Sequence, residues 1–197
     1  MSEAAPGKDA RRDHVPGEEG VWLLIGGDMV LFSLLFVVFL TMRGEQVAVF
    51  EQGRMLLNQN WGLVNTLLML TSSWCVVTGV QAARDQRAAL TVRCFGAALV
   101  CGLAFAGVKY FEYSEKLQAG YTITTNDFFM LYFIYTGIHL LHVVIGMGVL
   151  ITLMVYSRSG GFTAGKVRNL ESGASFWHLV DLLWIVLFAL LYLLGGT

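Results

Sequence analysis

Two histidines three positions apart in a long apolar stretch, TGIHLLHVVIG, are the side chains here with the clearest chemical potential. His139 and His142 share one face of a helix, because side chains at i and i+3 are neighbours on a helix surface. His178 and Asp181 have the same spacing in a second apolar stretch, FWHLVDLLW. Imidazole and carboxylate groups in this arrangement can bind a metal, carry a proton or link helices by hydrogen bonds.

A metal site is the least favoured of these uses. The chain has only four histidines, and one of them, His14, lies in a polar N-terminal segment. A haem held by two histidines needs them to face each other across helices, and a di-iron centre in a bundle needs several carboxylates with Glu-x-x-His motifs, which the sequence lacks. We predict neutral histidines hydrogen-bonded between helices, with no metal and no catalytic residue, and keep a proton or quinone role as the alternative.

Two carboxylates complete the candidate site residues. Asp28 lies about eight residues, or roughly 12 Å, into the first apolar stretch. An ionised carboxylate at that depth is costly, so we expect it to be neutral, paired or hydrated, in either a proton-linked site or a structural hydrogen bond. Glu112 lies close to Lys109, Glu115 and Lys116 at the end of the third apolar stretch. Their spacing favours a solvated, partly paired helix end, and the alternative is that Glu112 turns inward toward a histidine.

The surrounding sequence is that of a membrane protein. It has 197 residues, 56% of them hydrophobic and 14% charged, with a net charge of −1 that gives no reason to expect nucleic acid. A membrane-spanning helix needs about 20 mostly apolar residues. The sequence therefore predicts an all-α, five-helix transmembrane bundle in one domain, residues 20–197, after a polar tail, residues 1–19. The predicted helices lie at about 20–42, 61–83, 90–117, 128–156 and 173–194.

The basic residues predict the orientation. The tail and the second and fourth loops contain Lys8, Arg11, Arg12, Arg84, Arg87, Arg93, Arg158, Lys166 and Arg168. The other side has Arg43, Arg54 and Lys116, with Lys109 near that end of its helix. Because cytoplasmic loops are enriched in Lys and Arg, we expect a cytoplasmic N-terminus and a C-terminus on the outer side.

Four stretches together resemble a known family. They are GVWLLIGGDMVLF, FEYSEKLQAGYT, TGIHLLHVVIG and ESGASFWHLVDLLWIVLF. In these stretches, and from about residue 15 to the end, the chain resembles subunit III of the haem-copper oxidase superfamily. It matches the five-helix form, which lacks the two extra N-terminal helices of the seven-helix form. The stretch NTLLMLTSSWCVV and the short length look most like the NorE-type protein associated with nitric oxide reductase, and subunit III of a cytochrome c or quinol oxidase is the alternative.

The resemblance implies a non-catalytic accessory subunit of a bacterial inner membrane, with its C-terminus in the periplasm. Such a subunit holds no redox cofactor, binds phospholipid between its helices, and lies beside a catalytic haem-copper subunit and other subunits of the complex. It supports the stability, proton uptake and catalytic lifetime of that catalytic subunit. Two rival classes remain: an independent haem- or quinone-binding protein, and a proton-conducting transporter or channel.

The family's intramembrane carboxylate corresponds to Asp28, where many members have Glu. The family's other recurring polar positions correspond to Glu112, His139, His142, His178 and Asp181.

Overall fold

The computed structural model describes residues 19–194, which are helical apart from turns. The elements are α1 (Glu19–Glu45), α2 (Val47–Met55), α3 (Gln59–Arg84), α4 (Ala88–Gln118), α5 (Asp127–Arg158), α6 (Ala164–Phe188) and the π-helical η1 (Ala189–Leu193). Within this described part, five helical stretches are long and apolar enough to cross a membrane: α1, α3, α4, α5, and α6 continued by η1. The predicted all-α fold with five spans is confirmed. Residues 1–18 of the predicted tail lie outside the described residues.

Two elements differ from the sequence prediction. The short α2 has no predicted counterpart, because it buries only Phe50 and Gly53 and is too polar and too short to resemble a span. The last long helix begins at Ala164 rather than near residue 173, because Thr163 caps it by accepting a hydrogen bond from the backbone N–H of Lys166. The first turns of α6 are polar, so hydrophobicity alone does not reveal them.

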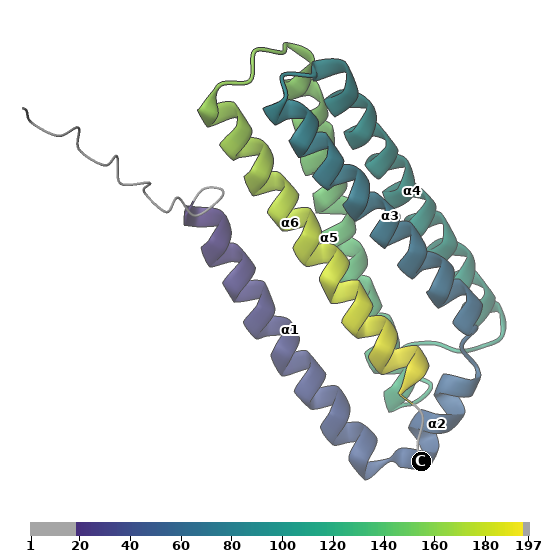
Figure 1. Cartoon of the computed structure of the whole chain (residues 1–197). Helices are drawn as coiled ribbons and strands as arrows, with labels where there is room; N and C mark the ends of the chain where they lie inside the picture. Colours follow the sequence, from purple (N-terminus) through teal and green to yellow (C-terminus); the bar gives the residue numbers. More distant parts are fainter. Residues whose placement is uncertain (1–18, 195–197) are drawn as a thin grey trace, which may run out of the picture.

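Helices α3 to α6 form a bundle, and α1 lies along one side of it next to α6 (Figure 1). Trp177 of α6 is completely buried in this bundle. A Cβ atom at Gly146 of α5 would lie 2.7 Å from the Trp177 ring, and one at Gly102 of α4 would lie 3.1 Å from it. The indole Nε1 donates to Ser72 Oγ of α3 at 3.1 Å, and Ser72 in turn donates to the Ala98 carbonyl at 2.9 Å. Small residues therefore let one large side chain connect four helices.

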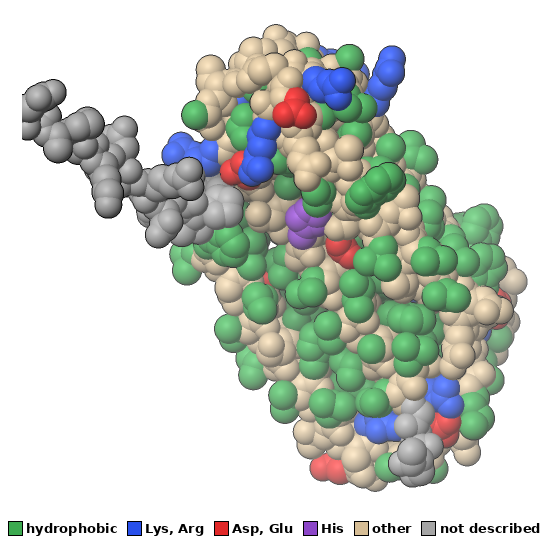
Figure 2. All heavy atoms as spheres, in the orientation of Figure 1, with side chains coloured by type: hydrophobic (Ala, Val, Ile, Leu, Met, Phe, Trp, Pro, Cys, Tyr) green, Lys and Arg blue, Asp and Glu red, His purple; other side chains and the backbone are tan. Residues whose placement is uncertain are grey.

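Hydrophobic side chains cover the middle of the surface, and basic and acidic side chains gather toward its two ends (Figure 2). This distribution matches the hydrocarbon core and the two headgroup layers of a bilayer. The protein is therefore a multi-pass membrane protein.

Candidate functional site

The candidate site residues lie at three separate helix contacts. One contact joins α1 to α5, the second lies inside the bundle between α4, α5 and α6, and the third joins α3 to α6. The six predicted residues are Asp28 and His142 at the first contact, Glu112 and His139 at the second, and His178 and Asp181 at the third. They do not form one polar cluster.

Asp28 and His142 form the contact between α1 and α5. Oδ2 of Asp28 lies 3.5 Å from Nε2 of His142, and the two side chains are 19% and 14% exposed. Nδ1 of His142 lies 2.9 Å from the Ile138 carbonyl, so Nδ1 carries a proton and donates it in this hydrogen bond. The Phe32 ring of α1 packs edge-on against the imidazole.

This geometry leaves Nε2 of His142 facing the carboxyl group of Asp28. The pair can hold one shared proton, either on the carboxyl group or on Nε2, and the second arrangement gives a carboxylate and an imidazolium. Both forms are chemically sensible for a half-buried acid in a membrane helix. The pair is therefore suited to holding or exchanging a proton at the edge of the bundle.

The second contact centres on Lys109, which is almost completely buried at 1% exposure. Its Nζ donates to Glu112 Oε2 at 2.8 Å and to the Tyr192 hydroxyl at 2.9 Å. The Tyr192 hydroxyl donates to the other oxygen of Glu112 at 2.5 Å. Rings of Trp184, Tyr132, Tyr192 and Tyr113 surround the ammonium group at 4.8 to 5.9 Å. The ion pair is closed off by aromatic side chains, which also attract a cation to their faces.

The inward position of Glu112 corrects the favoured prediction of a solvated helix end. Glu112 is fully buried, and the partner that it reaches is Lys109 rather than a histidine. Of the other charges of that segment, Lys116 pairs with its neighbour Glu115, which is 55% exposed. Tyr192 of η1 supports this inward position, because its hydroxyl is hydrogen-bonded to both Lys109 and Glu112.

His139 also points into the bundle, but it has no hydrogen-bond partner among the described residues. Its ring packs against Phe105 of α4 and Trp184 of α6 at centroid distances of 5.6 and 5.4 Å. His139 and His142 therefore point to different neighbours although their spacing places them on one side of α5. His139 is held by ring packing, whereas the prediction gives both histidines interhelical hydrogen bonds.

The third contact joins α3 and α6 through His178. Its Nδ1 lies 2.6 Å from Ser73 Oγ and 3.9 Å from Asp181 Oδ2, so Ser73 is the hydrogen-bonded partner and Asp181 is a more distant neighbour. The His178 side chain is 35% exposed, and that of Asp181 is 9% exposed. Sequence spacing identifies the neighbouring Asp181 but not Ser73, which comes from a different helix.

Tyr192 and Ser73 are therefore the site residues that the sequence does not reveal, whereas the i,i+3 spacing of Lys109 and Glu112 predicts their pairing but not their burial. Lys109 appears in the sequence as part of a charged helix end, and Tyr192 and Ser73 appear as ordinary residues of apolar helices. One feature of the sequence could have pointed to Tyr192. It is a tyrosine in an apolar C-terminal helix, and a buried tyrosine hydroxyl requires a hydrogen-bonding partner.

None of the three contacts gathers a metal-ligand set. Over residues 19–194, no group of three or more His, Cys, Asp or Glu side chains is arranged to hold a metal ion. Each contact instead links two or more helices through a few ionisable groups. The fold and these contacts define a multi-pass membrane protein whose intramembrane polar groups connect its helices.

Comparison with known proteins identifies the family. The family model described as cytochrome c oxidase subunit III matches residues 18–196. The cytochrome c oxidase subunit 3 of Synechocystis sp. is 30% identical over 98% of this chain and 88% of its own length. The corresponding protein of Bacillus sp. (strain PS3) is 27% identical over 98% of this chain and 92% of its own. The cytochrome bo(3) ubiquinol oxidase subunit 3 of Pseudomonas aeruginosa is 27% identical over 90% and 84%.

The chain therefore belongs to the cytochrome c oxidase subunit III family, whose members are non-catalytic accessory subunits of oxidase complexes.

Proposed function

We propose that this chain is subunit III of an oxygen-reducing haem-copper oxidase of a bacterial inner membrane. The family match over residues 18–196 is the observation that carries this proposal. The relatives named above are subunits of cytochrome c oxidases and of a ubiquinol oxidase. Their names favour an oxygen-reducing complex over a nitric oxide reductase complex. The partner is then a catalytic subunit that carries the haems and metals.

Association with nitric oxide reductase, as a NorE-type protein, is the second candidate. It is favoured by the NTLLMLTSSWCVV stretch of α3 and by the short chain. The relatives above do not support it. Co-purification from native membranes followed by mass spectrometry decides between the two: recovery of an oxygen-reducing catalytic subunit supports the proposal, and recovery of nitric oxide reductase subunits overturns it.

The Asp28–His142 pair is the part of this chain that fits a role in proton supply. It is half-buried, lies at the edge of the bundle and can hold a proton between two groups. We expect Asp28→Ala to shorten the catalytic lifetime or lower the turnover of the purified oxidase without changing its haem or copper content. Asp28→Glu restores the carboxyl group and is the conservative control, and Ser33→Ala changes an exposed position on the same helix. Unchanged lifetime and turnover in Asp28→Ala would make Asp28 a purely structural residue.

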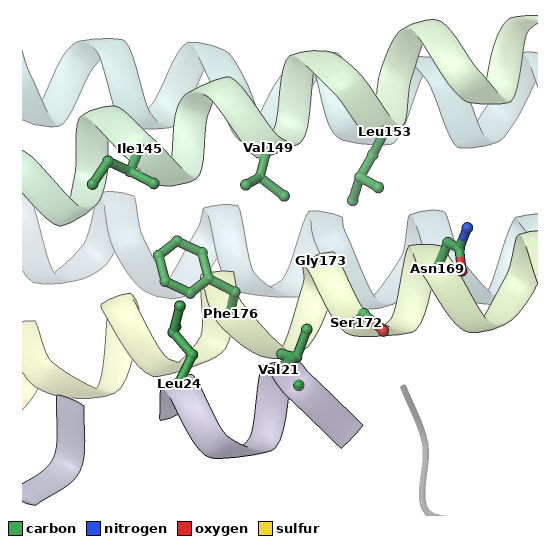
Figure 3. A pocket seen from close by; sticks show the side chains of 10 residues that line it. Val21, Leu24, Ile145, Val149, Leu153, Asn169, Ser172, Gly173 and Phe176 are labelled. Carbon is green, nitrogen blue, oxygen red and sulfur yellow. The ribbon is translucent and has the colours of Figure 1, made fainter. Parts of the chain in front are cut away.

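A groove between α1, α5 and α6 fits the proposed phospholipid. Its volume is about 430 Å³, and its walls are mostly apolar, with polar side chains only at one end (Figure 3). The lining residues are Gly20, Val21, Leu24, Ile145, Val149, Leu153, Asn169, Ser172, Gly173 and Phe176. An acyl chain matches the apolar walls, and Asn169 lies where a more polar part of the lipid would be. Val149→Trp fills the groove, and we expect it to lower the phospholipid retained by the purified complex, while Val155→Trp on the exposed side of α5 does not.

The orientation follows from the basic residues. The loops at the α3–α4 and α5–α6 end contain Arg84, Arg87, Arg158, Lys166 and Arg168. The opposite end has Arg43, Arg54 and Lys116. By the positive-inside rule, the first end faces the cytoplasm, so the N-terminus is cytoplasmic and the C-terminus periplasmic. Labelling of single cysteines from the periplasmic side tests this: Ser159→Cys should be protected and Thr124→Cys labelled, and the reverse pattern contradicts it.

Two further measurements test the accessory role itself. A Soret band from the isolated chain would support a haem-binding protein and defeat this role. Proton flux in liposomes that contain only this chain would support a transporter or channel.

A further inference from the structure

The proposed function leaves the outward-facing side of His178 without a role. His178 lies near the middle of the fifth span, Ala164–Leu193, about 20 Å from either end at 1.5 Å per residue. Its side chain is 35% exposed, compared with 14% for His142. Ser73 is the hydrogen-bond partner of Nδ1. The other ring nitrogen, Nε2, has no hydrogen-bond partner among residues 19–194. Figure 2 shows histidine and acidic side chains at the surface among hydrophobic ones.

Unlike Nε2 of His178, the hydroxyl groups of four threonines on the spans have hydrogen-bond partners within their own helices. Each donates its hydroxyl to the backbone carbonyl four residues earlier, at 2.7 to 2.9 Å. These threonines are Thr41, Thr71, Thr78 and Thr152. A polar group satisfied within its own helix can face lipid, because the hydrocarbon core offers no hydrogen bond of its own. Nε2 of His178 points away from the bond to Ser73, so it requires a partner other than residues 19–194.

The side chains around His178 form a surface suited to a helix. Trp74, next to Ser73 on α3, is 70% exposed near the middle of its span, whereas tryptophan in membrane proteins is enriched at the headgroup layers. Spacings of three and four residues place exposed apolar side chains on the same faces of α3 and α6. We call this surface the α3/α6 face: Leu70, Trp74, Val77, His178, Leu182 and Ile185.

We propose that the α3/α6 face docks a transmembrane helix of another subunit of the oxidase, and that this helix carries a hydrogen-bonding side chain that reaches Nε2 of His178. This inference rests on the proposed place of the chain in an oxidase complex. Lipid chains can cover Trp74 and Leu182 but cannot satisfy the ring nitrogen. A helix from another subunit supplies both close packing and an interhelical hydrogen bond, which are the interactions that join helices in membranes.

Photo-crosslinking in the intact complex tests the surface. We place p-benzoylphenylalanine at position 74 and, as a matched control, at Val144, which is 51% exposed on α5. We expect irradiation at position 74 to give an adduct with another oxidase subunit, and irradiation at position 144 to give lipid adducts. Lipid adducts alone at position 74, or an adduct with a second copy of this chain, would overturn the inference. Absence of the chain from the purified oxidase before irradiation is a different result and would defeat the proposed function itself.

Substitution of the two hydrogen-bonded residues separates docking from folding. His178→Leu keeps an apolar side chain in the membrane and removes Nε2, and we expect it to lower the amount of chain that co-purifies with the oxidase by about threefold, the effect of one interhelical hydrogen bond. His178→Gln retains a hydrogen-bonding group and should restore part of the loss. Ser73→Ala removes only the bond within the chain and should leave co-purification close to that of the unmodified protein. Equal loss in His178→Leu and Ser73→Ala would mean that His178 acts only inside this chain, and the inference would be wrong.

Discussion

The Lys109–Glu112 pair and the Asp28–His142 pair each join a basic and an acidic side chain inside the membrane, but their surroundings differ. Lys109 and Glu112 are 1% and 0% exposed, and Tyr192 bridges them by hydrogen bonds. Asp28 and His142 are 19% and 14% exposed, and their nearest side-chain atoms are 3.5 Å apart. The first pair is closed within the packed bundle, and the second lies where α1 meets it. Burial makes the first pair a fixed structural link, whereas the partial exposure of the second is the basis of its proposed role in proton exchange.

The largest effect is expected for Lys109→Met. It leaves Glu112 buried without its ammonium partner, and removal of one member of a buried ion pair costs about 3–5 kcal/mol. We expect the unfolding free energy of the purified chain in detergent to fall by that amount. The double variant Lys109→Met/Glu112→Leu removes both charges and should recover most of the loss. If Lys109→Met were as stable as the unmodified chain, the buried pair would have no structural role and would not differ from the exposed pair in this respect.

A smaller effect is expected for His142→Leu. It leaves the Asp28 carboxyl group without its partner, but partial exposure limits the cost to about 1–3 kcal/mol. We expect the amount of chain incorporated into the oxidase to fall more than the turnover of each assembled complex. Asp28→Asn removes the acidic group of the same pair from α1 and serves as the matched variant, for which we expect a similar loss of incorporation. Normal assembly with lost turnover would show that His142 serves the chemistry more than the attachment of α1.

Tyr135→Phe isolates the attachment of α1 from the acid–base pair. The Tyr135 hydroxyl of α5 donates to the Leu35 carbonyl of α1 at 2.6 Å. Loss of this bond is expected to cost about 1 kcal/mol. The expected signature is faster proteolysis at the connection between α1 and α2, around residue 46, with little change in the rest of the bundle. Uniformly faster cleavage at all loops would mean that α1 and the bundle unfold together.

The smallest effect is expected at an exposed pair. Arg84 is 58% exposed and binds Glu171 at 2.6 Å at the end of the bundle. Arg84→Gln should change the unfolding free energy by about 0.2–1 kcal/mol, and less at high salt, because solvent and ions screen such pairs. The change in unfolding free energy of Arg84→Gln is the small reference value against which that of Lys109→Met is compared. A loss comparable to that of Lys109→Met would contradict the link between burial and effect.

Much of the fold could be predicted because the signal is local. Long apolar stretches must form helices in a bilayer, where every backbone polar group has to be satisfied within its own segment. The short α2 could not be predicted in this way because it does not cross the bilayer. The start of α6 could not be predicted from hydrophobicity either, because its first turns are polar and the helix start is marked only by the cap at Thr163.

The candidate site was harder to predict because its contacts join different helices. The i,i+3 spacing correctly places Asp181 beside His178, but it says nothing about Ser73. It also places His139 and His142 on one side of α5, while the structure directs one toward α4 and α6 and the other toward α1. Glu112 has the spacing of a solvated helix end and is nevertheless buried against Lys109.

Three properties follow from the sequence alone: the chain is helical, it crosses the membrane, and certain residue types lie within the apolar layer. These properties depend on the length and composition of each segment. Which polar groups meet, are closed off or remain at the surface depends on how the helices pack. Spacing along one helix sets the neighbours within that helix, whereas the packing of small residues such as Gly102 and Gly146 around Trp177 sets the distances between helices.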